Sequence, residues 1–316
     1  MNRIRISISP RTAFASPMLG EMVFGQFCCL LKMLRGEEFL TNALAGYKEN
    51  QPFCVVSDAF PSGYLPLPSL PSFFWDTEGT DRKTAKGREW IEGTKMSEPL
   101  KKWQQFARGA GDFVDPDTKS SGWRKDIQAH NTIRRDTATT GTGMFAPYLA
   151  DIVWYGVDQQ LDLYVLFDER LSQDIVVDVF TKMGLIGFGA DASAGAGKFV
   201  VTEVDQTAAP GASISRMTLA SCDLSKMSLC EDLSFYRIKT HFGRHGDAMA
   251  HNANPFKRPL LLARRGAVLT FSEPSDALFV GRGIGNVSYA MPDSVVHQGY
   301  APVVELPDLN ASDFEL

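Results

Sequence analysis

Hydrophobic and polar positions near the start of the chain first alternate and then change to a helical spacing. The stretch "IRISIS" alternates with period two, which predicts a strand. Six apolar residues at helical spacing follow, and Gly36 is suited to end that helix: Met22, Val23, Phe27, Leu30, Leu31 and Leu34. The apolar run "FCVV" then predicts a second strand, so the chain begins with strand, helix and strand.

A second group of elements is predicted between residues 151 and 204. "DIVWYGV" and "DLYVLF" are predicted to form a hairpin across Asp158–Gln160. A helix is predicted from Leu171 to Met183, with Ser172 as its N-cap and Gly184 as its C-terminal stop. The strand "KFVVTEV" comes after it. Together with the first three elements, this order is typical of a ferredoxin-like sheet.

The remaining sequence is rich in strand candidates and poor in helices, so we expect an α+β protein with a second, degenerate unit in residues 201–316. The first unit is assigned to residues 1–200. The strand candidates of the second unit are "MTLASCDL", "LSFYRIKTHFG", "RPLLLARRGAVLTF", "ALFVG" and "APVVEL".

Residues 72–128 are polar and scatter four tryptophans among charged residues, which suggests an insertion rather than a core. Residues 82–135 carry 13 lysines and arginines against 7 acidic residues, a local charge of +6. The rest of the chain therefore carries −11, since the net charge is −5. A basic region on an acidic protein either binds a polyanion or is a solvated charged face.

Composition indicates a soluble globular protein, with 44% hydrophobic and 22% charged residues. The first residues lack the apolar segment of a signal peptide, and no apolar run has the length of a membrane span. The five cysteines have no metal-binding spacing, so we expect buried free thiols, a cytoplasmic location and no membrane association.

The stretch "GLIGFGADASAGAGKF" (residues 184–199) holds five glycines and one lysine. It fails the Walker pattern, because Ala192 and Phe199 stand where that pattern needs glycine and Ser or Thr. It contains G-x-G-x-x-A, but the dinucleotide fingerprint follows a strand and opens a helix, and the order here is helix, loop, strand. The loop is therefore either a wide structural turn or a surface against which a polymer backbone lies.

Two other stretches carry candidate chemistry. In "AHNTIRRDTATTGTGMF", His130, Arg134 and Arg135 can donate to phosphate, and the threonines and glycines offer hydroxyl and amide donors, unless this is simply a polar loop. "HFGRHGDAMAH" places His241, His245 and His251 close together. Its glycines favour a hairpin over the helix that a metal-binding H-x-x-x-H pair needs, so no metal site is expected.

At this point five blocks, in this order, resemble one known family. They are "SDAFPSGYLPLP", "HNTIRRDTATTGTGMF", the glycine loop, "NPFKRPLLLARRGAVLTF" and "VVHQGYAPVVEL". The chain resembles the RAMP proteins of CRISPR systems, and among them the subunit at the 5′ end of the guide RNA in type III-A (Csm) interference complexes. The resemblance covers most of the chain outside residues 72–128. It departs from the family at Asp191 and Ala192, where basic residues are common, and at the doubled arginine Arg134-Arg135.

The resemblance implies two ferredoxin-like, RRM-related units with a basic thumb, which we place within Arg82–Arg135. Trp90, Trp103, Phe106 and Trp123 are the candidates to stack on bases, and the alternative for each is to pack on the body of the protein. It implies a non-catalytic subunit, present in one copy in a ribonucleoprotein, that binds the repeat-derived 5′ handle of the crRNA. Its partners would be the large polymerase-like subunit and a backbone RAMP subunit, and neither a cofactor nor a metal is expected.

The expected RNA-binding residues come from the two blocks that match the family's handle-binding motifs. The four loop glycines are expected to approach the RNA backbone or to adopt positive φ. The full set is His130, Asn131, Arg134, Arg135, Thr137, Gly187, Gly189, Ser193, Gly195, Gly197 and Lys198.

Two other functions remain open from the sequence. Some related RAMP proteins cleave repeat RNA, so the chain is alternatively a metal-independent endoribonuclease with His130 or His241 as general base. The acidic charge outside residues 82–135 instead favours an assembly module that binds only proteins.

Overall fold

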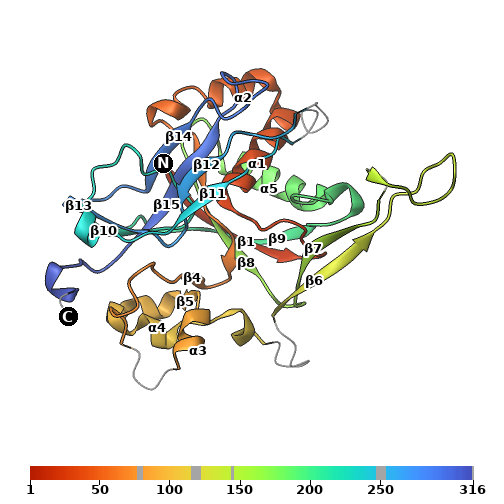
Figure 1. Cartoon of the computed structure of the whole chain (residues 1–316). Coiled ribbons are helices and arrows are strands. Elements are labelled where there is room, and N and C mark those ends of the chain that lie inside the picture. Colours follow the sequence, from red (N-terminus) through yellow and green to blue (C-terminus); the bar gives the residue numbers. More distant parts are fainter. Residues whose placement is uncertain (77–80, 115–121, 144–145, 247–253, 315–316) are drawn as a thin grey trace.

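A computed structural model describes residues 1–76, 81–114, 122–143, 146–246 and 254–314. Two four-stranded antiparallel paths dominate it, and three two-stranded ribbons surround them (Figure 1). None of the helices in these ranges is long and apolar enough to cross a membrane. The cysteines are free, and the expectation of buried thiols holds for Cys54 and Cys222 but not for Cys29, which is exposed.

The first sheet has the strand order β2-β8-β1-β9, with a short strand β3 also paired to β8. Its strands are β1 (Asn2–Pro10), β2 (Cys54–Val56), β3 (Phe60–Pro61), β8 (Leu161–Phe167) and β9 (Phe199–Gln206). Helix α1 (Gly20–Arg35) connects β1 to β2, and helix α5 (Gln173–Ile186) connects β8 to β9. This is the strand order and connection pattern of a βαββαβ unit.

Alternation along β1 explains how this sheet is buried. Ile4, Ile6 and Ile8 lie on one face and are completely buried in a cluster that also contains residues of α1 and α5. Four residues of the stripe predicted for α1 are buried, namely Val23, Phe27, Leu30 and Leu31, and the helix ends at Gly36 with φ of 93°. Met22 and Leu34 of the stripe are half-buried, and the buried Phe24 was not predicted. The first strand and the first helix are therefore confirmed as predicted.

Helix α5 begins as predicted but ends three residues later. The Ser172 side chain accepts a hydrogen bond from the Ile175 amide, so it is the N-cap. The helix continues through Gly184 to Ile186, and Gly187, with φ of 107°, is the C-cap. Gly184 is needed for packing, because a Cβ there would lie 2.3 Å from the Phe199 carbonyl oxygen. Predicting the stop at Gly184 was wrong for this reason.

The second sheet has the order β13-β10-β15-β14. Its strands are β10 (Ser213–Thr218), β13 (Val268–Ser275), β14 (Phe279–Ile284) and β15 (His297–Glu305). Within the described part of residues 201–316 the helices are short 3-10 turns, Glu231–Leu233 and Ala311–Asp313. The predicted strands are found only in part, because β10 shares just Met217 and Thr218 with the candidate at 217–224, and the candidate at 258–271 is divided between β12 (Leu260–Ala263) and β13. The strand order also differs from that of the first sheet. A second ferredoxin-like unit is therefore not confirmed.

Six further strands form the three ribbons. They are β4 (Tyr64–Pro66) with β5 (Trp90–Glu92), β6 (Trp123–His130) with β7 (Tyr148–Tyr155), and β11 (Ile238–His241) with β12 (Leu260–Ala263). The described residues also form three short α-helices: α2 (Glu37–Ala43), α3 (Arg82–Gly87) and α4 (Trp103–Phe106). Short 3-10 helices lie at Tyr47–Glu49, Gly93–Ser97, Leu100–Lys102, Ala110–Asp112 and Ala192–Ala194.

Part of the segment 72–128 builds a core, contrary to expectation. Trp75, Trp90 and Trp103 are buried in a second hydrophobic cluster, together with Met217 of β10 and Val268 of β13. Trp103 is completely buried, and its Nε1 donates to the Glu98 carbonyl oxygen at 2.8 Å. Trp90 and Trp103 therefore hold this segment against the second sheet and are not free to stack on RNA bases.

Only the end of Arg82–Arg135, the region in which a thumb was predicted, belongs to a projecting hairpin. The hairpin β6–β7 spans Trp123–Tyr155 and projects from one side of the molecule (Figure 1). Its strand β7 pairs with β6, whereas the sequence predicted that it pairs with β8. Strand β8 instead lies inside the first sheet between β1 and β2. The hairpin prediction across residues 158–160 was wrong because this short turn connects β7, in the ribbon, to β8, in the first sheet.

Side chains tie the two halves of the chain together. Gln298 of β15 donates to the Val56 carbonyl oxygen at 2.7 Å and accepts from the Val56 amide at 2.9 Å. The Tyr300 hydroxyl donates to the Tyr47 carbonyl oxygen at 2.7 Å, inside the first core. The domain boundary near residue 200 stays a prediction. These hydrogen bonds connect residues on the two sides of it.

Candidate nucleic-acid interface

The glycine loop is a closed structural turn at the end of α5. Gly187, Gly189, Gly195 and Gly197 all have positive φ, between 70° and 107°, as predicted. The non-glycine Asp191 also has φ of 56°, where a side chain is less favoured. The path of the loop therefore depends on its glycines.

The atoms that crowd most of these glycines belong to the protein itself. A Cβ on Gly187 would lie 2.3 Å from the Ala196 carbonyl oxygen, and one on Gly197 would lie 2.2 Å from that of Phe188. A Cβ on Gly189 would lie 2.5 Å from the Ser16 Cβ. Gly195 alone among the four has open space beside it. A polymer backbone thus has room to approach at Gly195. At the other three positions glycine is required because the protein's own atoms leave no space for a side chain.

Most backbone amides of the loop are already hydrogen-bonded. The Phe188 amide donates to the Gly197 carbonyl oxygen, and the Gly189 amide donates to Gln26 Oε1 at 3.1 Å. Gln26 also donates from Nε2 to the Gly187 carbonyl oxygen at 2.7 Å, so this side chain of α1 clamps the loop. The sequence analysis missed Gln26, which has no signal beyond its place on a predicted helix.

The segment 11–16, after β1, holds the loop from its other side. The Gly197 amide donates to the Ala13 carbonyl oxygen at 2.7 Å, and the Arg11 amide donates to that of Lys198 at 2.7 Å. The Lys198 amide donates to Thr12 Oγ1 at 2.9 Å. Arg11 and Lys198 are therefore neighbours, and both have exposed side chains. Arg11 is a further candidate phosphate contact that sequence reasoning did not single out.

The same segment joins the loop to the projecting hairpin. Phe14 and Val153 of β7 form a backbone bridge, and the Phe14 ring packs edge-on against Tyr155 at 5.5 Å. Val153 pairs with Lys125 near the base of the hairpin, and Tyr148 pairs with His130 at its far end. Five residues of strand separate these levels, which is about 17 Å. The loop thus lies at the base of the hairpin, and His130 lies well beyond it.

The donors predicted in the second block lie at or beyond the end of β6. Asn131, Arg134, Arg135 and Thr137 are exposed, in the connection between β6 and β7. His130 stacks on Tyr148, with ring centroids 5.0 Å apart and planes 8° apart. Its Nε2 is buried and has no hydrogen-bond partner within the described ranges. These residues form a polar tip, separate from the glycine loop and connected to it along the hairpin.

The two arginines at the tip differ in their surroundings. Arg134 forms an ion pair with Asp136 at 2.7 Å, and its Nε also donates to that carboxylate at 3.2 Å. Arg135 is exposed, and its guanidinium forms no ion pair with any described residue. Arg135 is therefore the better donor for a ligand, whereas Arg134 must first leave Asp136.

Outside the hairpin, His241 and His245 contact other side chains of the protein. His241 Nδ1 lies 3.4 Å from Glu21 Oε1, and its ring centroid lies 4.9 Å from that of His297. Burial, then Lys239 and Lys257, lower the pKa of His241 to about 4. His245 Nε2 is hydrogen-bonded to Ser288 Oγ at 2.9 Å, and His251 lies outside the described residues. Among described residues, no group of three or more potential metal ligands is found.

Comparisons with known proteins give a consistent fold. No family model matches the chain, and no curated protein sequence matches it significantly. Solved structures do match over 97% of this chain. One is the Csm3-Csm4 subcomplex in the type III-A CRISPR-Cas interference complex, with TM-score 0.61, 12% identity and full coverage of the matched chain. Another is the Csm1-Csm4 cassette in complex with pppApA, with TM-score 0.58, 14% identity and 99% coverage. The chain therefore has the fold of Csm4 of the type III-A CRISPR-Cas interference complex.

Proposed function

We propose that this chain is a non-catalytic subunit of a type III-A interference complex that binds the 5′ handle of the crRNA. The observation that carries the proposal is the fold, shared over nearly the whole chain with Csm4 in its Csm1 and Csm3 complexes. By that likeness, its protein partners are the large polymerase-like subunit and the backbone RAMP subunit.

The RNA surface would run from the glycine loop along the β6–β7 hairpin. Arg11 and Lys198 supply exposed cations at the base, and Arg135 supplies one at the tip. Exposed aromatic side chains line the hairpin between them, with Tyr148 47% and Trp154 42% exposed. Cations along a path with interspersed aromatic rings are what single-stranded RNA binding requires.

A complex assembled with and without the hairpin tip tests this proposal. Replacing residues 131–147 by a two-residue Asn-Gly turn shortens the exposed hairpin and leaves all three hydrophobic clusters intact. We expect the shortened subunit to fold and to join both protein partners, while the complex loses most of the guide RNA that co-purifies with the wild type. Sequencing that RNA shows whether the repeat-derived handle is retained.

The control is the variant Arg35→Gln/Lys226→Gln, which removes two exposed cations elsewhere and should retain guide RNA. If the shortened subunit retains guide RNA at the wild-type level, handle binding through the hairpin is wrong and the protein-only assembly module is favoured. Incubation of the wild type with repeat RNA, without divalent metal, tests catalysis. Cleavage that is lost in His130→Ala or His241→Ala would contradict the non-catalytic assignment.

A further inference from the structure

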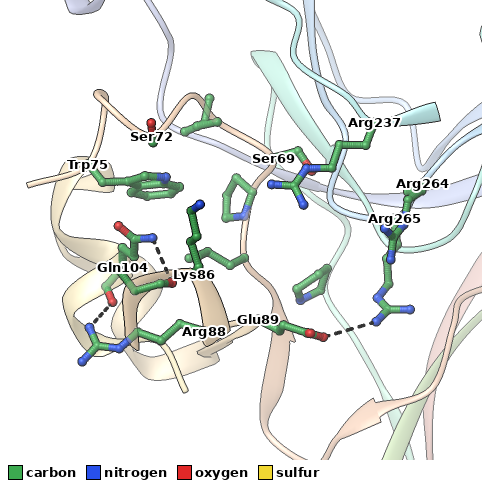
Figure 2. A pocket seen from close by; sticks show the side chains of 15 residues that line it. Ser69, Ser72, Trp75, Lys86, Arg88, Glu89, Gln104, Arg237, Arg264 and Arg265 are labelled. Atoms are coloured by element: carbon green, nitrogen blue, oxygen red, sulfur yellow. Dashed lines mark hydrogen bonds and ion pairs between the residues drawn. The ribbon is translucent and has the colours of Figure 1, made fainter. Parts of the chain in front are cut away.

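A separate cavity of about 520 Å³ lies between the segment 66–104 and the second half of the chain (Figure 2). Its walls are the proline-rich connection after β4, helix α3, and the turns beside β11 and β12. None of its lining residues belongs to the glycine loop or to the β6–β7 hairpin. Five of them are cationic, and Glu89 is the one acidic residue among them: Lys86, Arg88, Arg237, Arg264 and Arg265.

Two of the five cations are engaged by the protein. Arg265 Nη1 forms an ion pair with the buried Asp58 at 3.1 Å, and its Nη2 lies 3.9 Å from Glu89 Oε2. Its Cζ lies over the Trp90 ring, 4.9 Å from the ring centroid. Arg88 donates from Nη1 to the Gln104 carbonyl oxygen at 2.6 Å. These two arginines therefore fix the walls of the cavity.

The other three cations have no such partners. Lys86, Arg237 and Arg264 are exposed, and their charged groups form no ion pair or hydrogen bond with any described residue. Figure 2 shows Lys86 and Arg237 reaching into the space from opposite walls. They come from segments about 150 positions apart in the sequence, which only the fold brings together.

Local backbone geometry keeps Arg237 and Arg264 together. The Arg264 amide donates to the Arg237 carbonyl oxygen at 2.8 Å, which places the two residues side by side. The tight turn after Arg265 uses Gly266 at φ of 78°, and the Gly266 carbonyl oxygen accepts from the Ser69 amide at 2.8 Å. The turn is thereby attached to the proline-rich wall, so the backbone positions of Arg237, Arg264 and Arg265 beside the cavity are fixed.

Charge identifies the class of ligand. Five cations against Glu89 and Asp58 give the cavity a charge of +3, on a chain whose net charge is −5. Like charges gathered beside apolar walls repel one another until an anion compensates them. Two adjacent arginines offer the planar donor pairs that match phosphate oxygens, and Pro66, Leu67 and Pro68 give an apolar surface on which a base can lie.

We propose that this cavity binds the phosphate groups of a nucleotide, either free or as part of an RNA strand. Its volume is within the range of about 300–1,000 Å³ that is usual for small-ligand sites. Arg237 and Arg264 hold the phosphate oxygens, and Lys86 adds a charge from the opposite wall. The site does not depend on handle binding, so either proposal can fail without the other.

The test uses the full chain carrying Arg135→Gln and Lys198→Gln, which weakens the surface of the proposed function. The probes are ATP, AMP and a labelled single-stranded oligoadenylate without a 5′ phosphate. We expect at least one probe to bind at low salt, and Arg237→Gln/Arg264→Gln to weaken it by about tenfold or more. If ATP binds more tightly than the oligoadenylate, the site takes a free nucleotide; if the oligoadenylate binds and AMP does not displace it, the site takes a strand.

Matched variants keep the result interpretable. Arg35→Gln/Lys226→Gln removes the same charge elsewhere and should change affinity by less than about twofold. Lys86→Gln changes only the opposite wall of the cavity and should weaken binding by a few-fold. This variant still tests the proposal if Arg237→Gln/Arg264→Gln fails to fold. Absence of binding by all three probes, equal loss in the control variant, or displacement of bound ATP by a polyglutamate peptide at similar concentration would each overturn the proposal.

Discussion

Phe14 and Val153 exchange two backbone hydrogen bonds, each of 2.9 Å. The bridge joins the segment after β1 to the base of the β6–β7 hairpin, although 139 positions separate the two residues in the sequence. Because Ala13 and Thr12 of the same segment accept from the loop residues Gly197 and Lys198, the glycine loop and the hairpin share one support. Their relative position is therefore fixed by hydrogen bonds to the segment 11–16.

We predict that Gly197→Ala destabilises the fold far more than Gly195→Ala. At Gly197, φ is 70° and a Cβ would overlap the backbone of the buried Phe188, so the cost is about 3 kcal/mol or more. At Gly195 the space is open and only the positive φ is unfavourable, at about 1–2 kcal/mol. Urea unfolding of both variants measures the difference. Equal unfolding free energies would show that the Phe188 contact is not rigid.

The elements that could be predicted from the sequence are those whose buried face appears as a regular spacing of apolar residues within the element itself. Strand β1 and helix α1 show their buried faces in their own letters, as Ile4, Ile6 and Ile8 illustrate. The β6 strand, "WRKDIQAH", shows no alternation because most of its residues on both faces are exposed. Trp103 was a candidate for base stacking because its neighbours in sequence are charged, whereas it is buried in a cluster that also contains Met217 of β10 and Val268 of β13.

The candidate site was predicted in part for a similar reason. Positive φ at the four loop glycines could be expected, because glycine is the residue that adopts it most easily. What crowds each glycine could not be expected, since Ser16 lies more than 170 positions away from Gly189. The cations that line the cavity of Figure 2 could not be grouped from the sequence for the same reason, because Lys86 and Arg237 come together only in the folded chain.

Arg135→Gln should weaken RNA binding more than Arg134→Gln. Arg135 is free to contact phosphate, while Arg134 is held by Asp136 at 2.7 Å. If Arg135 contacts one phosphate, its loss should reduce the slope of log K against log salt by about 0.7 for single-stranded RNA. Fluorescence anisotropy with handle-containing RNA at several salt concentrations measures both quantities. A larger loss in Arg134→Gln would mean that the Asp136 ion pair opens on binding.

Two tryptophans should separate stability from RNA binding. Trp103 is completely buried, so Trp103→Ala should lower the free energy of unfolding by about 3–5 kcal/mol. Trp154 on the hairpin is 42% exposed, so Trp154→Ala should change stability by less than about 1 kcal/mol. If Trp154 stacks on a base, its loss weakens RNA binding by about 1–3 kcal/mol. Chemical unfolding and RNA titration of both variants test the assignment, and a folded Trp103→Ala of wild-type stability would contradict the buried core.

The buried histidines predict how stability depends on pH. Burial is the main cause that lowers the pKa of His241 to about 4 and that lowers the pKa of His297, so both are neutral in the folded protein at neutral pH. The unfolded chain, with histidine pKa near 6.5, binds more protons between about pH 6.5 and pH 4, so stability falls as the pH falls through that window. For His241 the loss is at most about 3 kcal/mol. In His241→Asn, unfolding free energies measured between pH 7 and pH 4 should decline less steeply than in the wild type, whereas parallel curves would show that His241 does not titrate in this range.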